Sequence, residues 1–189
     1  GGWSLDLSGP VMERAIFHIE NSYKVANLRV RGLLCKTNVQ SNTAFRGFGG
    51  PQSMLICEAY MEHVARALGV RTAAVQERNL YNAGDHTHYL QVLPDCHIRR
   101  MWAQVMESAE VARRQQEALA FNAAHRWKKR GLATVPVKFG MSFTAKFLNQ
   151  AAALVLVYKD GSCLVSHGGT EMGQGLHTKM QQVAARALG

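Results

Sequence analysis

Two glycine-rich segments carry the residue types and spacing best suited to bind a ligand. The first reads TAFRGFGGPQ at residues 43–52 and the second GGTEMGQGLHTK at residues 168–179, and each leads into a segment of helical periodicity. A helix N-terminus presents unpaired N–H groups and a partial positive charge, and glycine lets the backbone approach a ligand closely. One such loop is more often only a turn, but two together predict a site for an anionic or polar ligand.

The spacing within these segments disfavours nucleoside triphosphates. Neither segment contains a phosphate loop of the form GxxxxGK followed by Ser or Thr, and neither has GxGxxG opening a helix. His167 and His177 stand beside glycines, yet a lone histidine near a loop is more often satisfied by a hydrogen bond than bound to a metal. Glu171 could serve as a general base by residue type alone. We assign no role to these three.

The periodicity of apolar residues and the capping residues predict the helices and strands that position both loops. The pattern predicts a mixed α+β fold with two units in which a strand, a glycine loop and a helix follow one another. A helix after Pro10, one closed by Gly69 and one capped by Asp95 are expected. The predicted helices span residues 11–17, 52–68, 72–81, 97–126 and a segment from 176, and the predicted strands span 27–35, 132–139, 151–158 and 163–167.

Composition bounds the class of protein. The chain has 189 residues with 47% apolar and 19% charged side chains, which predicts one globular domain or part of a larger one and disfavours disorder, collagen and membrane spanning. Cys35, Cys57, Cys96 and Cys163 have no zinc-binding spacing. Scattered cysteines without a signal peptide fit small buried side chains in a reducing, intracellular compartment.

The positive charge leaves a second class of function open. Lysine and arginine exceed the acids by nine, and they cluster at 99–100, 113–114 and 128–130. No aromatic residues interleave with them, so they indicate a solvated helix face, and the cations at 128–130 suit a helix C-terminus. A nucleic-acid-binding basic fragment and an inert fragment remain the alternatives from a different class.

Both glycine segments resemble the xanthine dehydrogenase and aldehyde oxidase family, the first its molybdenum-site segment and the second its pterin-cofactor loop. Matches at residues 34–38, 127–131 and 147–150 extend the resemblance over nearly the whole chain. The resemblance implies part of a molybdopterin-binding domain, with helices packed on short mixed or antiparallel sheets. Residues 1–189 are then expected to form a partial domain, truncated at both ends and inactive alone, with the catalytic base elsewhere.

The resemblance also implies roles for individual residues. Arg14 matches the arginine that faces the purine and stabilises charge in the reaction, which makes it both a catalytic and a substrate-binding candidate. Phe48 and Phe143 match the rings that hold the purine, and Thr144 matches a hydrogen-bonding partner. The cofactor contacts implied are Arg46, whose backbone lies beside the molybdenum, Gly47, Met172, Gly173 and Gln174. Because the aldehyde-oxidising branch commonly lacks the arginine and the Phe-Thr pair, these residues favour the xanthine-oxidising branch.

The family's cofactors and partners follow in the same way. The resemblance implies molybdenum–molybdopterin here, and two 2Fe–2S clusters and FAD elsewhere in a full-length chain. It implies oxidation of hypoxanthine and xanthine towards urate, with NAD or oxygen as acceptor, in a cytoplasmic homodimer; a peroxisomal location and an aldehyde oxidase are the alternatives. No nucleic acid and no membrane are expected as partners. Both glycine loops should then line one cavity with Arg14, Phe48 and Phe143.

Overall fold

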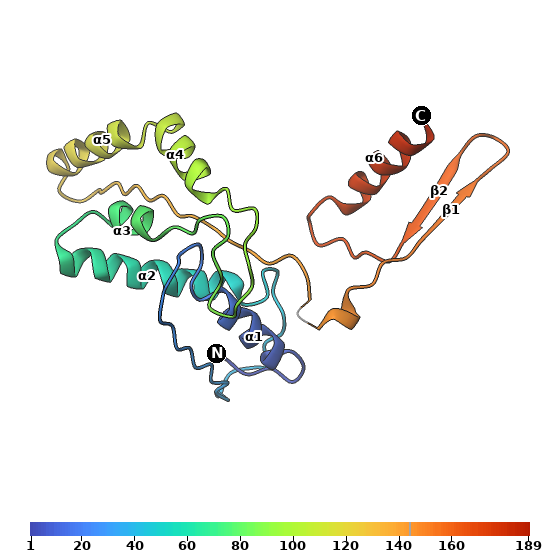
Figure 1. Cartoon of the computed structure of the whole chain (residues 1–189), viewed down its shortest axis with the longest axis horizontal. Helices are drawn as coiled ribbons and strands as arrows, with labels where there is room; N and C mark the ends of the chain where they lie inside the picture. Colours follow the sequence, from blue (N-terminus) through green and yellow to red (C-terminus); the bar gives the residue numbers. More distant parts are fainter. Residues whose placement is uncertain (144) are drawn as a thin grey trace. The chain divides into compact units, whose positions relative to one another are not determined.

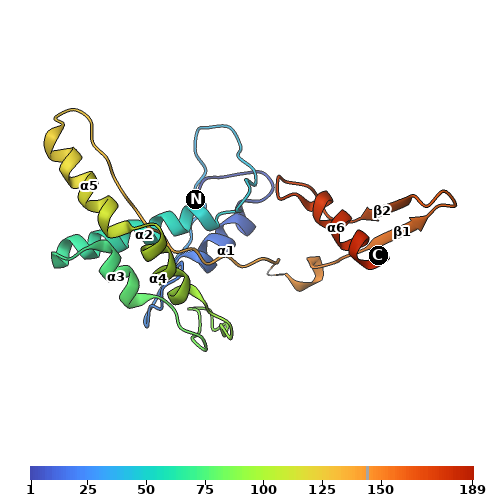
Figure 2. The same ribbon diagram turned by 90° about the horizontal axis from the view of Figure 1, so that it is seen from above.

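The computed structural model describes residues 1–143 and 145–189, which form two units, Gly1–Phe139 and Gly140–Gly189. Figures 1 and 2 show the helices of the first unit, and the hairpin and the helix that follows it in the second. None of the helices within these ranges is long and apolar enough to cross a membrane. The elements in chain order are α1 (Ser8–His18), α2 (Gly50–Leu68), α3 (Thr72–Asn79), α4 (Ile98–Ser108), α5 (Val111–Ala124), the 3-10 helix η1 (Lys146–Leu148), β1 (Ala153–Val157), β2 (Cys163–His167) and α6 (Leu176–Leu188).

Local signals place the first three helices as the sequence predicts. Pro10 lies in the first turn of α1, and Pro51 lies in that of α2. Gly69 ends α2 in the left-handed region at φ 65°, where its N–H donates to the carbonyls of Ala65 and Arg66. α1 packs against α2, and α2 packs against α3. The α+β class with short antiparallel pairing is confirmed.

The core of the first unit lies where α2, α3 and α4 meet. Its buried cluster joins Cys57, Met61 and Ala65 of α2 to Val75 of α3 and Trp102 of α4. Tyr23 and Leu80 complete the cluster, and they also form an isolated antiparallel bridge. Burial of this apolar surface is what holds the helices together.

The long helix predicted over residues 97–126 is wrong. Two helices occupy this stretch, because Ala109 ends α4 and Glu110, at φ 48°, begins α5. Trp102 and Val111 are both buried, and nine residues of a straight helix would place them about 180° apart. The break lets both side chains turn inward. The predicted cap is also wrong, since His97 and not Asp95 precedes α4.

Neither predicted strand of the first unit forms. Among the described residues, Gly1 is the partner of the backbone over 27–35, through Cys35 N–H to Gly1 O at 2.9 Å and the Gly1 amino group to Leu33 O at 2.7 Å. Over residues 132–139 side chains replace a neighbouring strand, because Gln76 donates to Thr134 O and Asn21 donates to Pro136 O. A β-strand needs a row of partner backbone groups, and here single residues supply them.

The cysteines are less buried than expected. Cys57 is fully buried, and burial raises the pKa of its thiol to about 12. Cys96 is half-buried, whereas Cys35 and Cys163 are exposed. The expectation that all four act as buried hydrophobes is therefore wrong for two of them.

The second unit contains the predicted hairpin and the helix that follows the second glycine segment. β1 and β2 pair antiparallel, with Val155 opposite Val165, around a turn at Asp160 and Gly161 in which Asp160 Oδ1 accepts from Ser162 N–H. α6 packs against β2. Among the described residues of this unit none is buried, and all five residues of β1 are exposed.

Candidate functional site

The first glycine segment turns sharply where it enters α2. Gly47, Phe48 and Gly49 all have positive φ, at 99°, 53° and 92°. The turn closes through Phe48 N–H to Phe45 O and Gly50 N–H to Gly47 O. A phenylalanine in the left-handed region costs on the order of 1–3 kcal/mol, and such strain concentrates at functional sites.

Close contacts with α1 explain why this turn needs glycine. A Cβ on Gly49 would overlap the carbonyl oxygen of Val11, and one on Gly47 would lie 2.6 Å from the Pro51 ring. The turn therefore sits directly against the helix that carries Arg14. A cavity of about 220 Å³ opens between them, and Val11, Gly49 and Gln52 are among its lining residues.

Arg14 is half-buried on α1 and faces an aromatic ring. Its guanidinium lies 5.5 Å from the ring centroid of Phe139, and Phe139 in turn abuts Gly50 at the start of α2. Of the predicted residues in the first unit, Arg14, Gly47 and Phe48 are half-buried and Arg46 is exposed. The structure thus brings Arg14 and the first glycine loop into one neighbourhood.

The second glycine segment forms a compact loop before α6. Gln174 holds it by accepting from Met172 N–H at 2.6 Å and donating to Thr170 O at 2.8 Å. The Glu171 carboxylate accepts from the N–H groups of Gly173 and Leu176, at 2.7 and 2.5 Å. Glu171 also accepts from Gly175 N–H at 3.1 Å.

Glu171 therefore fills the N-terminus of α6 with a charge from the chain itself. Desolvation would raise its pKa, but the backbone N–H groups of Gly175, Leu176 and Gly173 outweigh that effect and lower the pKa below its usual value. A carboxylate with these partners acts as a helix cap. His167 and His177 bond to each other, Nε2 to Nδ1, at 3.2 Å.

Phe143 also lies in the second unit, and Asn149 fixes its backbone. Phe143 N–H donates to Asn149 Oδ1 at 3.0 Å, and Asn149 Nδ2 donates to Phe143 O at 2.9 Å. The Phe143 side chain is exposed. Thr144 lies outside the described residues. Sequence reasoning gave Asn149 no role, although it stands in a segment that carries the family resemblance.

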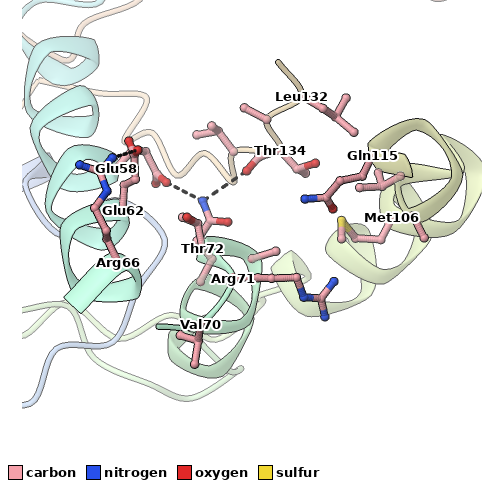
Figure 3. Close-up of a pocket in the computed structure, with 16 residues that line it drawn as sticks. Glu58, Glu62, Arg66, Val70, Arg71, Thr72, Met106, Gln115, Leu132 and Thr134 are labelled. Carbon is pink, nitrogen blue, oxygen red and sulfur yellow. Dashed lines mark hydrogen bonds and ion pairs between the residues drawn. The ribbon is translucent and has the colours of Figure 1, made fainter. Parts of the chain in front are cut away.

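A larger cavity of about 620 Å³ lies elsewhere in the first unit, between α2, α3, α5 and residues 132–135 (Figure 3). Glu58 and Thr134 face each other across the amide of Gln76, which donates to both. None of the predicted site residues that the structure describes lines it. Cavity volume alone therefore does not identify the candidate site.

At least one side chain of each basic cluster bonds to other residues of the first unit. Arg99 donates to Asn82 Oδ1 and to the carbonyl oxygen of Leu80. Arg113 forms ion pairs with Glu110 and Glu117. Lys129 donates to the carbonyl oxygens of Asn122 and His125 at the end of α5, as expected for a cation at a helix C-terminus.

Comparison with known proteins identifies the family. Two family models, each described as a molybdopterin cofactor-binding domain, match residues 1–80 and 104–189. The chain belongs to the molybdopterin cofactor-binding family. Both glycine segments fall inside the matched residues of this molybdopterin-binding chain.

Among curated proteins, the chain is similar to xanthine dehydrogenases along nearly all of its length. The chain is 54% identical over all of its length to xanthine dehydrogenase/oxidase of Gallus gallus. It is 56% identical over 99% of its length to xanthine dehydrogenase/oxidase of Felis catus. The molybdopterin-binding chain spans 14% of the length of each. The aldehyde oxidoreductase of Desulfovibrio gigas shares the fold, with a TM-score of 0.62 at 22% identity over 87% of this chain and 17% of that one.

Two glycines of the second loop leave their backbone open to a ligand, whereas Gly169 packs against Leu176. No atom lies within 4 Å of the position of a Cβ on Gly175, and Gly168 has only Ala152 O at 4.0 Å. A planar pterin with many hydrogen-bonding atoms can approach backbone that is open in this way. That Arg46, Gly47, Met172, Gly173 and Gln174 touch the cofactor stays a prediction, as does a single cavity lined by both loops.

Proposed function

We propose that the chain is the part of a xanthine dehydrogenase that cradles the molybdenum–molybdopterin cofactor and orients a purine beside it. High identity to xanthine dehydrogenases along the whole chain supports the proposal. The observation that carries it is Arg14 on α1, whose guanidinium lies beside Phe139. Val11 of the same helix packs against Gly49 in the strained turn at Phe48. Cofactor and substrate-orienting groups would then share one neighbourhood.

Each residue has a physical task in this proposal. When bound, the molybdenum–pterin supplies the oxygen transfer and the redox chemistry. The Arg14 guanidinium donates to the purine and stabilises the negative charge that develops on it. Phe48 and Phe143 orient the flat ring, and Thr144 donates or accepts a hydrogen bond. Met172, Gly173 and Gln174, with the backbone of Arg46 and Gly47, hold the cofactor.

The rest of the proposal concerns the longer protein. In it, 2Fe–2S clusters and FAD carry electrons to NAD or oxygen, two copies associate, and the location is the cytoplasm. Full-length protein should show flavin and iron–sulfur absorption and elute as a dimer in size-exclusion chromatography. A full-length protein that lacks molybdenum and flavin would contradict this part.

Arg14→Met in the full-length enzyme tests the assignment. We expect kcat/KM for xanthine to fall about 10²- to 10³-fold, because one charge-stabilising donor is lost. Turnover of a neutral aromatic aldehyde should change less than about threefold, because it offers less charge to stabilise. Steady-state kinetics normalised to molybdenum content measures both.

Arg66→Met is the matched control, since Arg66 is an exposed arginine of α2 that pairs with Glu62. It should leave both substrates unchanged. Equal loss on xanthine and aldehyde in Arg14→Met would contradict the role assigned to Arg14 and favour an aldehyde-oxidising enzyme.

A further inference from the structure

One exposed ring, that of Phe139, connects α1 with the first glycine loop. The Arg14 guanidinium lies 5.5 Å from its centroid, and the ring of His18 lies 4.8 Å away. On the loop side, a Cβ on Gly50 would be 2.6 Å from the Phe139 ring, so the ring packs against the start of α2. The candidate purine-binding cation and the loop beside it thus share one aromatic neighbour.

The backbone that carries Phe139 is anchored to the end of α1 by buried polar groups. Asn21, fully buried at φ 47°, donates to Pro136 O at 2.8 Å and accepts from Lys138 N–H at 3.3 Å. The Lys138 ammonium donates to the buried Glu20 carboxylate at 2.6 Å. Glu20 is held in turn by the backbone N–H and the ring of His88.

This anchoring makes the ring a fixed platform. Breaking a buried ion pair that is also hydrogen-bonded is costly, so residues 136–139 cannot drift freely from α1. His18 Nδ1 donates to Arg14 O, 2.7 Å away, and burial lowers the pKa of His18, which keeps its ring uncharged at neutral pH. The Arg14 cation therefore faces the ring of Phe139, which in turn lies against the uncharged ring of His18.

An aromatic face can fix a guanidinium without using its hydrogen-bond donors. Arginine has about 2 kcal/mol of rotamer entropy to lose, so a side chain that is already oriented binds a ligand with a smaller entropic cost. The N–H groups lie in the guanidinium plane, and a ring packed on its face leaves that plane to other partners.

We propose that Phe139 is a positioning residue that orients the Arg14 guanidinium towards the purine and keeps it in register with the first glycine loop. The inference rests on the proposed function, because that function gives Arg14 its substrate. It goes further by assigning purine selectivity to a residue that does not itself touch the purine.

Phe139→Leu in the full-length holoenzyme removes the aromatic face and keeps most of the bulk. We expect kcat/KM for xanthine to fall about fivefold to tenfold, the size of one partly desolvated cation–π contact. An aromatic aldehyde should change less than about twofold. Phe139→Tyr keeps the ring face and should restore xanthine turnover to within about twofold.

Phe17→Leu is the matched control. Phe17 also lies on α1, but its ring contacts Tyr89, with centroids 4.7 Å apart. Its loss should leave the ratio of xanthine to aldehyde turnover unchanged. If Phe139→Leu fails to retain molybdenum, Phe139→Met, whose flexible unbranched side chain fills irregular gaps, takes its place with the same expected outcomes.

A double-mutant cycle separates positioning from general damage. In an Arg14→Met background, Phe139→Leu should cause no further loss on xanthine. Equilibrium binding of xanthine to the molybdenum-free full-length protein, followed by calorimetry, should show the same pattern of coupling. Additive losses, or equal losses on both substrates, would overturn the inference.

The two proposals fail in different ways. If Arg14→Met lowers xanthine turnover selectively but Phe139→Leu does not, only the role of Phe139 is wrong. If Arg14→Met does not discriminate between purine and aldehyde, the proposed function is wrong and the role of Phe139 is overturned with it.

Discussion

Gly49 is the residue at which the chain has least freedom beside the candidate site. Its φ of 92° is one that side-chain-bearing residues rarely adopt, and a Cβ there would overlap the carbonyl of Val11. A substituent at this position strains the backbone and also pushes α1 away from α2. Both the helix that carries Arg14 and the turn at Phe48 would move.

Gly49→Ala should destabilise the chain by at least about 3 kcal/mol, because the strain of positive φ and the overlap with backbone add. Gly69→Ala is its control, since Gly69 also has positive φ, at 65°, but no atom within 4 Å of its Cβ position. That change should cost about 1 kcal/mol. Urea unfolding compares them, and equal losses would contradict the importance of the α1 contact.

At the scale of elements, the Glu58 carboxylate holds α2, α3 and the segment after α1 together. It accepts from Asn21 Nδ2 at 2.7 Å, Tyr23 OH at 2.8 Å and Gln76 Nε2 at 2.7 Å. All three donors are buried. Burial first, and then the adjacent Glu58 charge, raises the pKa of the Tyr23 hydroxyl, so Tyr23 remains a donor throughout the ordinary pH range.

Glu58→Ala should lower the free energy of unfolding by about 3 kcal/mol, because each of three buried side chains loses one hydrogen-bond acceptor. Asn21 and Gln76 keep their bonds to Pro136 O and Thr134 O. Glu62→Ala, one turn further along α2, removes an exposed carboxylate paired with Arg66 and should cost less than about 0.5 kcal/mol. Chemical denaturation of both variants gives the comparison. A similar small loss for Glu58→Ala would mean that water satisfies these donors.

Elements with local signals could be predicted, and elements that depend on distant partners could not. Pro10, Pro51 and Gly69 mark α1 and α2, and Asp160 with Gly161 marks the hairpin. Residues 132–139 have the composition of a strand, but side chains more than fifty positions away satisfy the backbone there. No local pattern contains that information.

The candidate site also contains residues that local motifs predict and residues whose role depends on distant partners. The glycine loops and Arg14 could be found because local motifs carry the family resemblance. Phe139 could not, since its role depends on a link between Asn21 and Pro136 across 115 positions. The unusual run of buried polar residues at 20–22 also looks like an ordinary polar turn in the sequence.

At the scale of the whole molecule, the two units differ in how many of their residues are buried. The first has a core around Tyr23, Cys57 and Trp102, while every described residue from 140 to 189 is at least partly exposed. Folding must offset about 1–2 kcal/mol of backbone entropy per residue, chiefly by apolar burial. The second unit, taken alone, has no buried apolar core to offset that loss of entropy.

Residues 1–139 produced alone should therefore unfold cooperatively in urea, and residues 140–189 produced alone should not. Far-ultraviolet circular dichroism of the shorter piece should show little helix, because α6 buries no residue. The exposed β1 should also make this piece prone to association. A sharp urea transition for residues 140–189 would contradict the expectation.

The ion pair between Glu20 and Lys138 has a consequence for how the protein is made. These residues are 118 positions apart, so a ribosome adding about 5 to 20 residues per second needs roughly 6 to 24 seconds between them. Throughout that interval Glu20, just after α1, lacks its lysine counter-charge, and α1 lacks its aromatic neighbour Phe139. The helix bearing Arg14 can pack on α2 earlier, but it reaches its final surroundings only after residues 138 and 139 have been made.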